Sequence, residues 1–223
     1  MKKNIIVIAP HPDDETLGCG GSLLKHQADG DIISWLIVTH MSLQNGYSQE
    51  KITAREKEIA SVSKQYNFQD VINLKFQPTM LDTLPKTDLI SALSQSFSKI
   101  KPNIVYFPFC NDIHSDHRVT SEAVLACSKT FRFPYLKTFR AYEVISETEF
   151  GNNLYHEAFH PNLWIDVSTY LEKKIEIMSI YESEIDQHPF PRSKKNIKNL
   201  ASFRGSTIGV QYAESFISVK DII

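Results

Sequence analysis

One stretch restricts this chain more than any other: an apolar run, Ile5–Ala9, that leads directly into His11, Asp13, Asp14 and Glu15. Ionisable groups this close together repel one another and resist burial unless a cation holds them. We therefore interpret the run as a buried strand that delivers metal ligands to the edge of a sheet. One imidazole and several carboxylates suit a borderline divalent cation such as zinc.

Strand and helix patterns alternate after this stretch. The first half is expected to form strands at 4–9, 32–39, 71–74 and 103–109 and helices at 16–29, 50–66, 87–100 and 116–130. This alternation predicts parallel βαβ units, and hence an α/β fold with a doubly wound, mostly parallel sheet.

The pattern weakens after Pro134. Further strands are expected at 138–145 and 163–167, helices at 170–184 and 195–203, and a turn at 205–209. A chain of 223 residues is long enough for one well-buried domain, and no composition shift suggests two. We expect residues 1–135 to carry the metal site and residues 136–223 to complete the pocket.

A second polar cluster, His114, Asp116 and His117, follows the strand expected at 103–109. Ligands of doubly wound sheets bind beyond the carboxyl ends of the strands, where the strand order reverses. Both clusters are therefore expected at one edge. His11, Asp14 and one of the two later histidines would give three protein ligands and one open position, as in catalytic zinc sites.

The remaining acids and the second histidine suggest hydrolysis. Zinc lowers the pKa of bound water to about 7, so this water would be the nucleophile. Asp13 is the candidate general base, and the other histidine would polarise a carbonyl or protonate the leaving group. Asp116 would orient an imidazole, or only favour a helix N-terminus. Glu15 would support the turn or a ligand, or begin the helix.

Composition excludes several other classes. The net charge of −2 gives no indication of nucleic-acid binding, and the short lysine and arginine clusters at 173–174 and 192–195 are expected to be solvated surface. The opening run is too short for a membrane anchor or a signal peptide. Three cysteines without a CxxC motif favour a reducing, cytoplasmic location. The glycines of Gly18–Gly21 lack the dinucleotide spacing, and the nearby acids would repel a pyrophosphate.

Two motifs resemble a known family. Ala9–Glu15 and His114–Arg118 are similar to the signatures of the LmbE-like deacetylases, which include the PIG-L type de-N-acetylases. Weaker similarity continues at Phe159–Asn162, Asp166, Tyr181–Ser183, Arg204–Gly205 and Ala213–Phe216. The resemblance implies a Rossmann-like fold with helices on both faces of the sheet, and zinc-dependent hydrolysis of an N-acetyl group on an amino sugar.

The resemblance also implies roles for single residues. His11, Asp14 and His117 would bind the metal, Asp13 would be the general base, and His114 would be the auxiliary catalytic histidine. Arg55 matches an arginine of the family that contacts substrate, although its alternative is an ordinary helix-surface residue. His40 stands where many members carry Asp or Gly; it is a candidate substrate contact or an ordinary loop histidine. Ser115 replaces the usual proline of the second motif.

The expected function is thus removal of an acetyl, or a similarly small acyl, group from a small N-acylated amino sugar or glycoconjugate. The alternatives are a metal-dependent esterase or amidase for another small substrate, and a non-catalytic metal- or nucleotide-binding module. A site with two histidines and one carboxylate also suits iron(II) or another divalent metal. The oligomeric state stays open, with a homo-oligomer among the alternatives.

Overall fold

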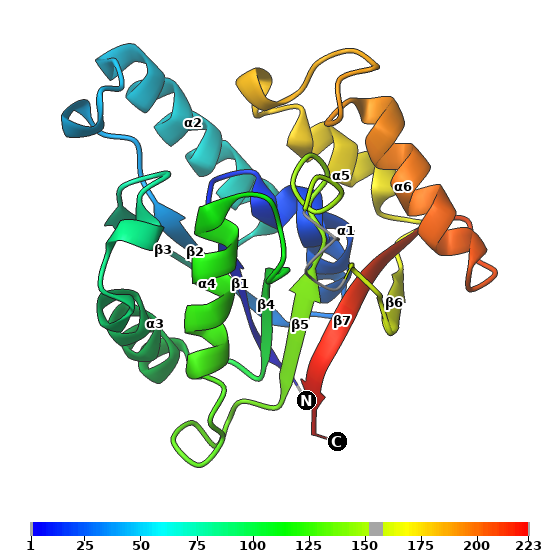
Figure 1. The fold of residues 1–223 in the computed structure, drawn as a ribbon. Helices are drawn as coiled ribbons and strands as arrows, with labels where there is room; N and C mark the ends of the chain where they lie inside the picture. The colour runs from blue at the N-terminus through cyan, green and yellow to red at the C-terminus, as the bar shows by residue number, and fades with distance from the viewer. Residues whose placement is uncertain (1, 152–157, 223) are drawn as a thin grey trace.

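A mixed sheet forms the centre of the computed structural model, which describes residues 2–151 and 158–222 (Figure 1). Within these residues, seven strands pair in the order β3-β2-β1-β4-β5-β7-β6. Their bounds are β1 Asn4–Ala9, β2 Ile32–Thr39, β3 Asp70–Phe76, β4 Ile104–Pro108, β5 Thr138–Tyr142, β6 Leu163–Asp166 and β7 Ala213–Asp221. The expected α/β fold with a mostly parallel sheet is confirmed.

The strand order reverses between β1 and β4. β1 pairs in parallel with β2 on one side and with β4 on the other, and the chain then continues outward in both directions. The residues that follow β1 and those that follow β4 therefore meet at one sheet edge. Because His11 follows β1 and His114 follows β4, the topology brings the two polar clusters of the sequence together.

Helices cover both faces of the sheet (Figure 1). The α-helices in the described part of the chain are α1 Asp14–Ala28, α2 Gln49–Tyr66, α3 Lys86–Ile100, α4 Ser115–Ala126, α5 Leu171–Met178 and α6 Lys194–Ser206. Alternate residues of β1 divide the core, as the pleat of a strand requires. Ile5 and Val7 pack with α1, α2, α5 and α6, whereas Ile6 and Ile8 pack with α3 and α4.

The second half of the chain differs from expectation in three places. β7 was not predicted; it lies antiparallel between β5 and β6. The helix expected at 170–184 ends at Met178, and a short 3₁₀ turn, Glu182–Glu184, follows. α6 continues to Ser206, so the turn expected at 205–209 begins later. β7 escapes a hydrophobicity pattern because buried polar residues, Glu214 and Ser215, interrupt its apolar side chains.

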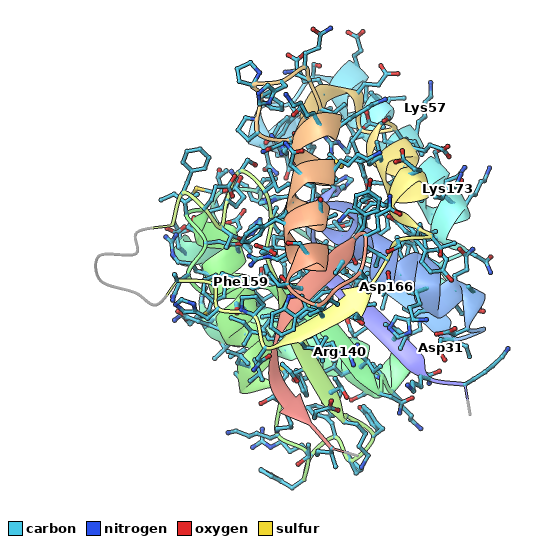
Figure 2. The ribbon with its side chains drawn as sticks, turned by 90° about the vertical axis from the view of Figure 1, so that its right-hand side faces the viewer. Asp31, Lys57, Arg140, Phe159, Asp166 and Lys173 are labelled. Carbon is cyan, nitrogen blue, oxygen red and sulfur yellow. The ribbon has the colours of Figure 1, made fainter. Side chains whose placement is uncertain are left out.

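Polar residues mark the sheet edge and the outer helix surfaces. β6 is a short edge strand, and the exposed Asp166 at its end lies on this edge in Figure 2. Short edges that carry charge resist pairing with other chains. Lys57 and Lys173 lie on the outer surfaces of α2 and α5 (Figure 2).

No helix among the described residues has both the length and the apolar character needed to cross a bilayer.

Candidate active site

In the turn between β1 and α1, backbone N–H groups donate hydrogen bonds to carboxylates of the same turn. The N–H of His11 donates to Oδ2 of Asp14 at 2.8 Å, and the N–H of Asp13 donates to Oε2 of Glu15 at 3.0 Å. Asp13 has a φ of 132°, where a non-glycine residue costs roughly 1–3 kcal/mol. The surrounding hydrogen bonds hold this strained residue in place, with its side chain in the wall of a cavity.

Glu15 supports this turn from below. It is fully buried and accepts hydrogen bonds from the hydroxyls of Thr16 at 2.6 Å and Tyr181 at 2.8 Å, besides the N–H of Asp13. Burial raises the pKa of Glu15 to about 7, against the effect of these hydrogen bonds. Of the two roles considered for Glu15, its contacts favour support of the turn.

His11, Asp14 and His117 converge on one point. Oδ2 of Asp14 lies 3.4 Å from Nδ1 of His11 and 3.2 Å from Nε2 of His117. One donor atom from each of the three residues lies within 4.8 Å of the others. Asp14 and His117 are buried, and His11 is partly exposed, so the group has one open side. The structure thus brings together the three residues expected to bind a metal.

A carboxylate holds the outward nitrogen of each imidazole. Nδ1 of His117 lies 2.8 Å from Oδ2 of Asp112, whose Oδ1 accepts a hydrogen bond from the Thr148 hydroxyl at 2.6 Å. Nε2 of His11 lies 3.0 Å from Oδ2 of Asp116. Metal-binding histidines are usually oriented in this way by a carboxylate on their other nitrogen. The donor set and its supports therefore fit a divalent cation.

The shifted pKa values of His11 and Asp14 show that positive charge stabilises this group. Burial lowers the pKa of His11, but its interactions with Asp116 and Asp14 outweigh this and raise the pKa to about 9. Burial opposes ionisation of Asp14, yet His117 and His11 lower its pKa well below the usual value. Without a metal, two imidazolium groups would supply the compensating charge; a dication could supply it instead.

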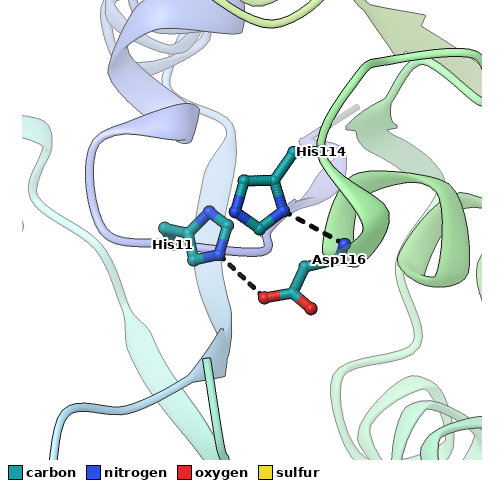
Figure 3. A group of neighbouring side chains, drawn as sticks. All are labelled: His11, His114 and Asp116. Atoms are coloured by element: carbon teal, nitrogen blue, oxygen red, sulfur yellow. Dashed lines mark hydrogen bonds and ion pairs between the residues drawn. The ribbon is translucent and has the colours of Figure 1, made fainter. Parts of the chain in front are cut away.

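His11, His114 and Asp116 form a second group whose donor atoms could surround a cation (Figure 3). This group is the poorer ligand set. Asp116 already accepts hydrogen bonds from the N–H of Thr79 at 2.7 Å and of Leu81 at 3.2 Å, and Nδ1 of His114 accepts one from the N–H of Asp116 at 3.1 Å. Asp116 thus has the contacts of an orienting residue, which also ties the 79–81 segment to the site.

Asp13 lines the same cavity as His11 and Asp14, but its carboxylate is held by residues outside the ligand group. Nη1 of Arg192 donates to Oδ2 of Asp13 at 3.1 Å, and Nη2 of Arg192 lies 3.3 Å from Oε2 of Glu184. Burial, Asp14 and Glu184 raise the pKa of Asp13 well above its usual value, and Arg192 acts against this. The carboxylate of Asp13 is therefore held by a cation outside the ligand group while it lies next to that group in the cavity wall.

A cavity of about 270 Å³ opens over these residues. Its lining includes His11, Asp13, Asp14, His114 and both expected substrate contacts, Arg55 and His40. Arg55 is buried, and its guanidinium donates to the carbonyl oxygen of Pro12 at 2.7 Å and pairs with Glu184. The helix-surface alternative for Arg55 is therefore wrong. His40 accepts a hydrogen bond at Nδ1 from the Asn73 amide at 3.1 Å and lies in the cavity wall.

Asp112, Glu184 and Arg192, which pair with predicted site residues, were not themselves predicted. Asp112 stands beside the second motif, and its place at the same strand end as His114 was a usable signal. Arg192 was assigned to solvated surface, which is wrong, because it lines the cavity and pairs with Asp13. The same assignment is wrong for Lys174, which is buried and lies 2.7 Å from Glu214. No local sequence pattern indicates that Arg192 or Lys174 pairs with an acid far away in the chain.

Comparisons with known proteins agree with the geometry. Residues 6–128 match the PIG-L family, described as GlcNAc-PI de-N-acetylase. The chain is 23% identical over 232 residues to a diacetylchitobiose deacetylase of Thermococcus kodakarensis, covering 99% of this chain and 84% of that protein. It is also 23% identical over 192 residues to a probable N-acetyl-alpha-D-glucosaminyl L-malate deacetylase 2 of Bacillus anthracis, covering 82% of each.

A solved structure has the same fold. The conserved protein TT1542 of Thermus thermophilus superposes with a TM-score of 0.78 at 26% sequence identity, covering 99% of this chain and 96% of that one.

Proposed function

Because the chain belongs to the GlcNAc-PI de-N-acetylase (PIG-L) family, we propose that it is a metal-dependent deacetylase that hydrolyses the N-acetyl group of a small amino sugar or sugar conjugate. Two relatives named as deacetylases of N-acetylated sugars support this substrate class. The observation that carries the proposal is the convergence of His11, Asp14 and His117 on one point, with Asp13 beside them in the cavity wall.

His11, Asp14 and His117 would hold the metal, which is zinc in our proposal, with iron(II) or another divalent cation as the alternative. When bound, such a cation makes water more acidic and polarises an amide carbonyl. Asp112 and Asp116 keep the two imidazoles in the orientation that this needs, because each accepts a hydrogen bond from a ring nitrogen. The cytoplasmic location expected from the sequence stays part of this proposal.

Asp13 is the general base of this mechanism. Its carboxylate takes a proton from the attacking water and later gives it to the amide nitrogen, so that the C–N bond breaks to a free amine and acetate. Arg192 supports this role by holding one oxygen of the carboxylate, Oδ2, at 3.1 Å. The other oxygen is then available to the water.

His114 supports the reaction as a neutral hydrogen-bond donor. Its Nδ1 accepts the N–H of Asp116, so the single proton of a neutral ring lies on Nε2. Burial and the neighbouring His11 and His117 lower the pKa of His114 to about 4, which keeps the ring neutral at pH 7. A neutral N–H in this position can donate to the oxygen that becomes negative during attack.

The test is acetate release by the purified chain from matched N-acetyl and O-acetyl glucosamine derivatives, before and after dialysis against a chelator. We expect release from the N-acetyl compounds that disappears on chelation and returns when zinc or iron(II) is added. Release from the O-acetyl compounds alone would assign the chain to the esterases. Activity that survives complete removal of metal would refute the proposed mechanism.

A further inference from the structure

The charges around the cavity bear on the part of the substrate that lies beyond the N-acetyl group. We infer that the site selects amino-sugar conjugates whose other groups are hydroxyls or a free amine, and that it discriminates against conjugates carrying a phosphate or a carboxylate. This inference rests on the proposed function, because it concerns the same cavity.

Every arginine or lysine that lines the cavity, among the described residues, already has an acidic partner. Arg55 contacts Glu184 and lies 3.1 Å from Glu58 through its Nε. Arg192 lies 3.1 Å from Asp13 and 3.3 Å from Glu184. The charge of each guanidinium is thus already balanced by carboxylates, with which an anionic group of the substrate would have to compete. Neither arginine therefore provides a free anion site.

In contrast to the two arginines, two carboxylates of the cavity lining lack a side-chain partner among the described residues. Glu56 on α2 and Glu147, which follows β5, both face the cavity. Among the described residues, the side chain of neither has a hydrogen-bond or ion-pair partner. Glu147 is partly buried, which raises the pKa of its carboxyl group, and it is close enough to His117, Asp14, Asp112 and Arg192 for their charges to act on it. These two acids come from different elements, α2 and the segment after β5, and a ligand in the cavity meets the negative charge of both.

Unpaired carboxylates of this kind suit particular chemical groups. They accept hydrogen bonds from sugar hydroxyls, and they pair with an ammonium group, such as the amine of an amino sugar that has already lost its acetyl group. A phosphate or carboxylate placed there would be repelled, because both arginines that line the cavity in the described part of the chain are already paired with carboxylates. The lining therefore attracts hydroxyl and ammonium groups of a substrate and repels anionic ones, and the difference gives specificity between these substrates.

The experiment uses three β-glycosides of N-acetylglucosamine that differ only at the end of a two-carbon aglycone: 2-hydroxyethyl, 2-aminoethyl and carboxymethyl. The metal-loaded full chain is assayed for acetate release from each, and kcat/KM is compared at low ionic strength. We expect the aminoethyl glycoside to equal or exceed the hydroxyethyl one. The carboxymethyl glycoside should be worse than the hydroxyethyl one by about threefold to thirtyfold, for one like charge near a partly solvated site.

Charge-neutral variants identify the residues responsible. Glu147→Gln and Glu56→Gln should each reduce the aminoethyl-to-carboxymethyl ratio of kcat/KM by about threefold or more, and together by about tenfold. Glu50→Gln is the matched control. Glu50 is exposed on the first turn of α2 and does not line the cavity, so this variant should leave the ratio unchanged. Because the ratio is measured within one protein, a loss of active protein does not affect it.

The outcomes of this experiment distinguish a failure of the charge inference from a failure of the proposed deacetylase function. If the carboxymethyl glycoside is cleaved as well as the aminoethyl one, or better, the charge inference is wrong while the deacetylase proposal stands. A ratio that Glu147→Gln and Glu56→Gln change no more than Glu50→Gln also overturns the inference. If none of the three glycosides releases acetate, the proposed function fails, and this inference fails with it.

Discussion

Nη1 of Arg192 donates to Oδ2 of Asp13 at 3.1 Å across a sequence separation of 179 residues. The proposed general base is thus held by a cation from the loop between α5 and α6. The same guanidinium reaches Glu184, which also pairs with Arg55. Two arginines and two carboxylates thereby connect the β1–α1 turn to α2 and to the segments around α5 and α6.

Replacing Arg192 should therefore slow the chemical step. We expect Arg192→Gln to lower kcat by roughly 10- to 100-fold, because the base loses its fixed orientation, while bound metal stays near the wild-type level. Arg192→Lys should restore part of kcat. Lys195→Gln, an exposed residue at the start of α6, is the control and should match the wild type. An Arg192→Gln enzyme with unchanged kcat would show that the pair has no part in turnover.

Asp112 should matter for metal affinity. It holds Nδ1 of His117 at 2.8 Å, and supporting carboxylates of this kind typically contribute 10- to 100-fold to affinity. We expect Asp112→Asn to weaken zinc binding by about that factor in competition with a chromogenic chelator. Asp88→Asn, on the exposed first turn of α3, tests whether any lost acid has this effect. Equal affinities for both variants would contradict the role assigned to Asp112.

Metal binding should release protons. The pKa of His11 in the metal-free fold is raised to about 9, chiefly because Asp116 and Asp14 outweigh the effect of burial. At pH 7 the ring is then protonated and must lose its proton to become a ligand, so metal affinity should rise with pH until about pH 9. Calorimetry in buffers of different ionisation enthalpy measures the released protons. No release at pH 7 would contradict this account of His11.

The raised pKa of His11 should also make the stability of the metal-free protein depend on pH. Because the folded-state pKa of His11 lies above its unfolded value, the stabilisation by its charged form is fully present below about pH 6.5 and is lost as the pH rises through about 9. The metal-free protein should accordingly lose stability over this pH interval. The metal-loaded protein should lose less, since the cation replaces the proton. Urea unfolding of both forms at pH 6.5 and 9 makes the comparison.

Gly18 lies where no side chain fits. A Cβ added to it would lie 2.2 Å from Cδ2 of Tyr142, whose ring is fully buried and whose hydroxyl donates to the carbonyl oxygen of Ile8 at 2.8 Å. We expect Gly18→Ala to destabilise the fold by about 1–3 kcal/mol through overpacking. Ser22→Ala in the same helix removes a buried hydroxyl that has no hydrogen-bond partner among the described residues, and it should be neutral or stabilising. Urea unfolding of both variants checks the contrast.

The site residues whose positions follow from the strand order could be predicted from the sequence. Those whose positions depend on the path of a loop could not. His11 and His114 follow adjacent parallel strands, so the reversal of strand order brings them together whatever the loops do. Arg192 reaches Asp13 only because the loop after α5 passes over the cavity, and nothing in Pro191–Ser193 shows this. β7 was missed because Glu214 is buried only with distant partners: the N–H groups of Gly21 and Ser22, and Lys174.

The central claim is that Asp13 works on water while His11, Asp14 and His117 hold the metal. It is tested most directly by measuring bound zinc and the rate of acetate release on the same samples of wild type, Asp13→Asn and His11→Ala. We predict that Asp13→Asn keeps the metal and loses about 100-fold or more of the rate, whereas His11→Ala loses both. A fully metal-loaded Asp13→Asn enzyme that turns over at the wild-type rate would contradict the account.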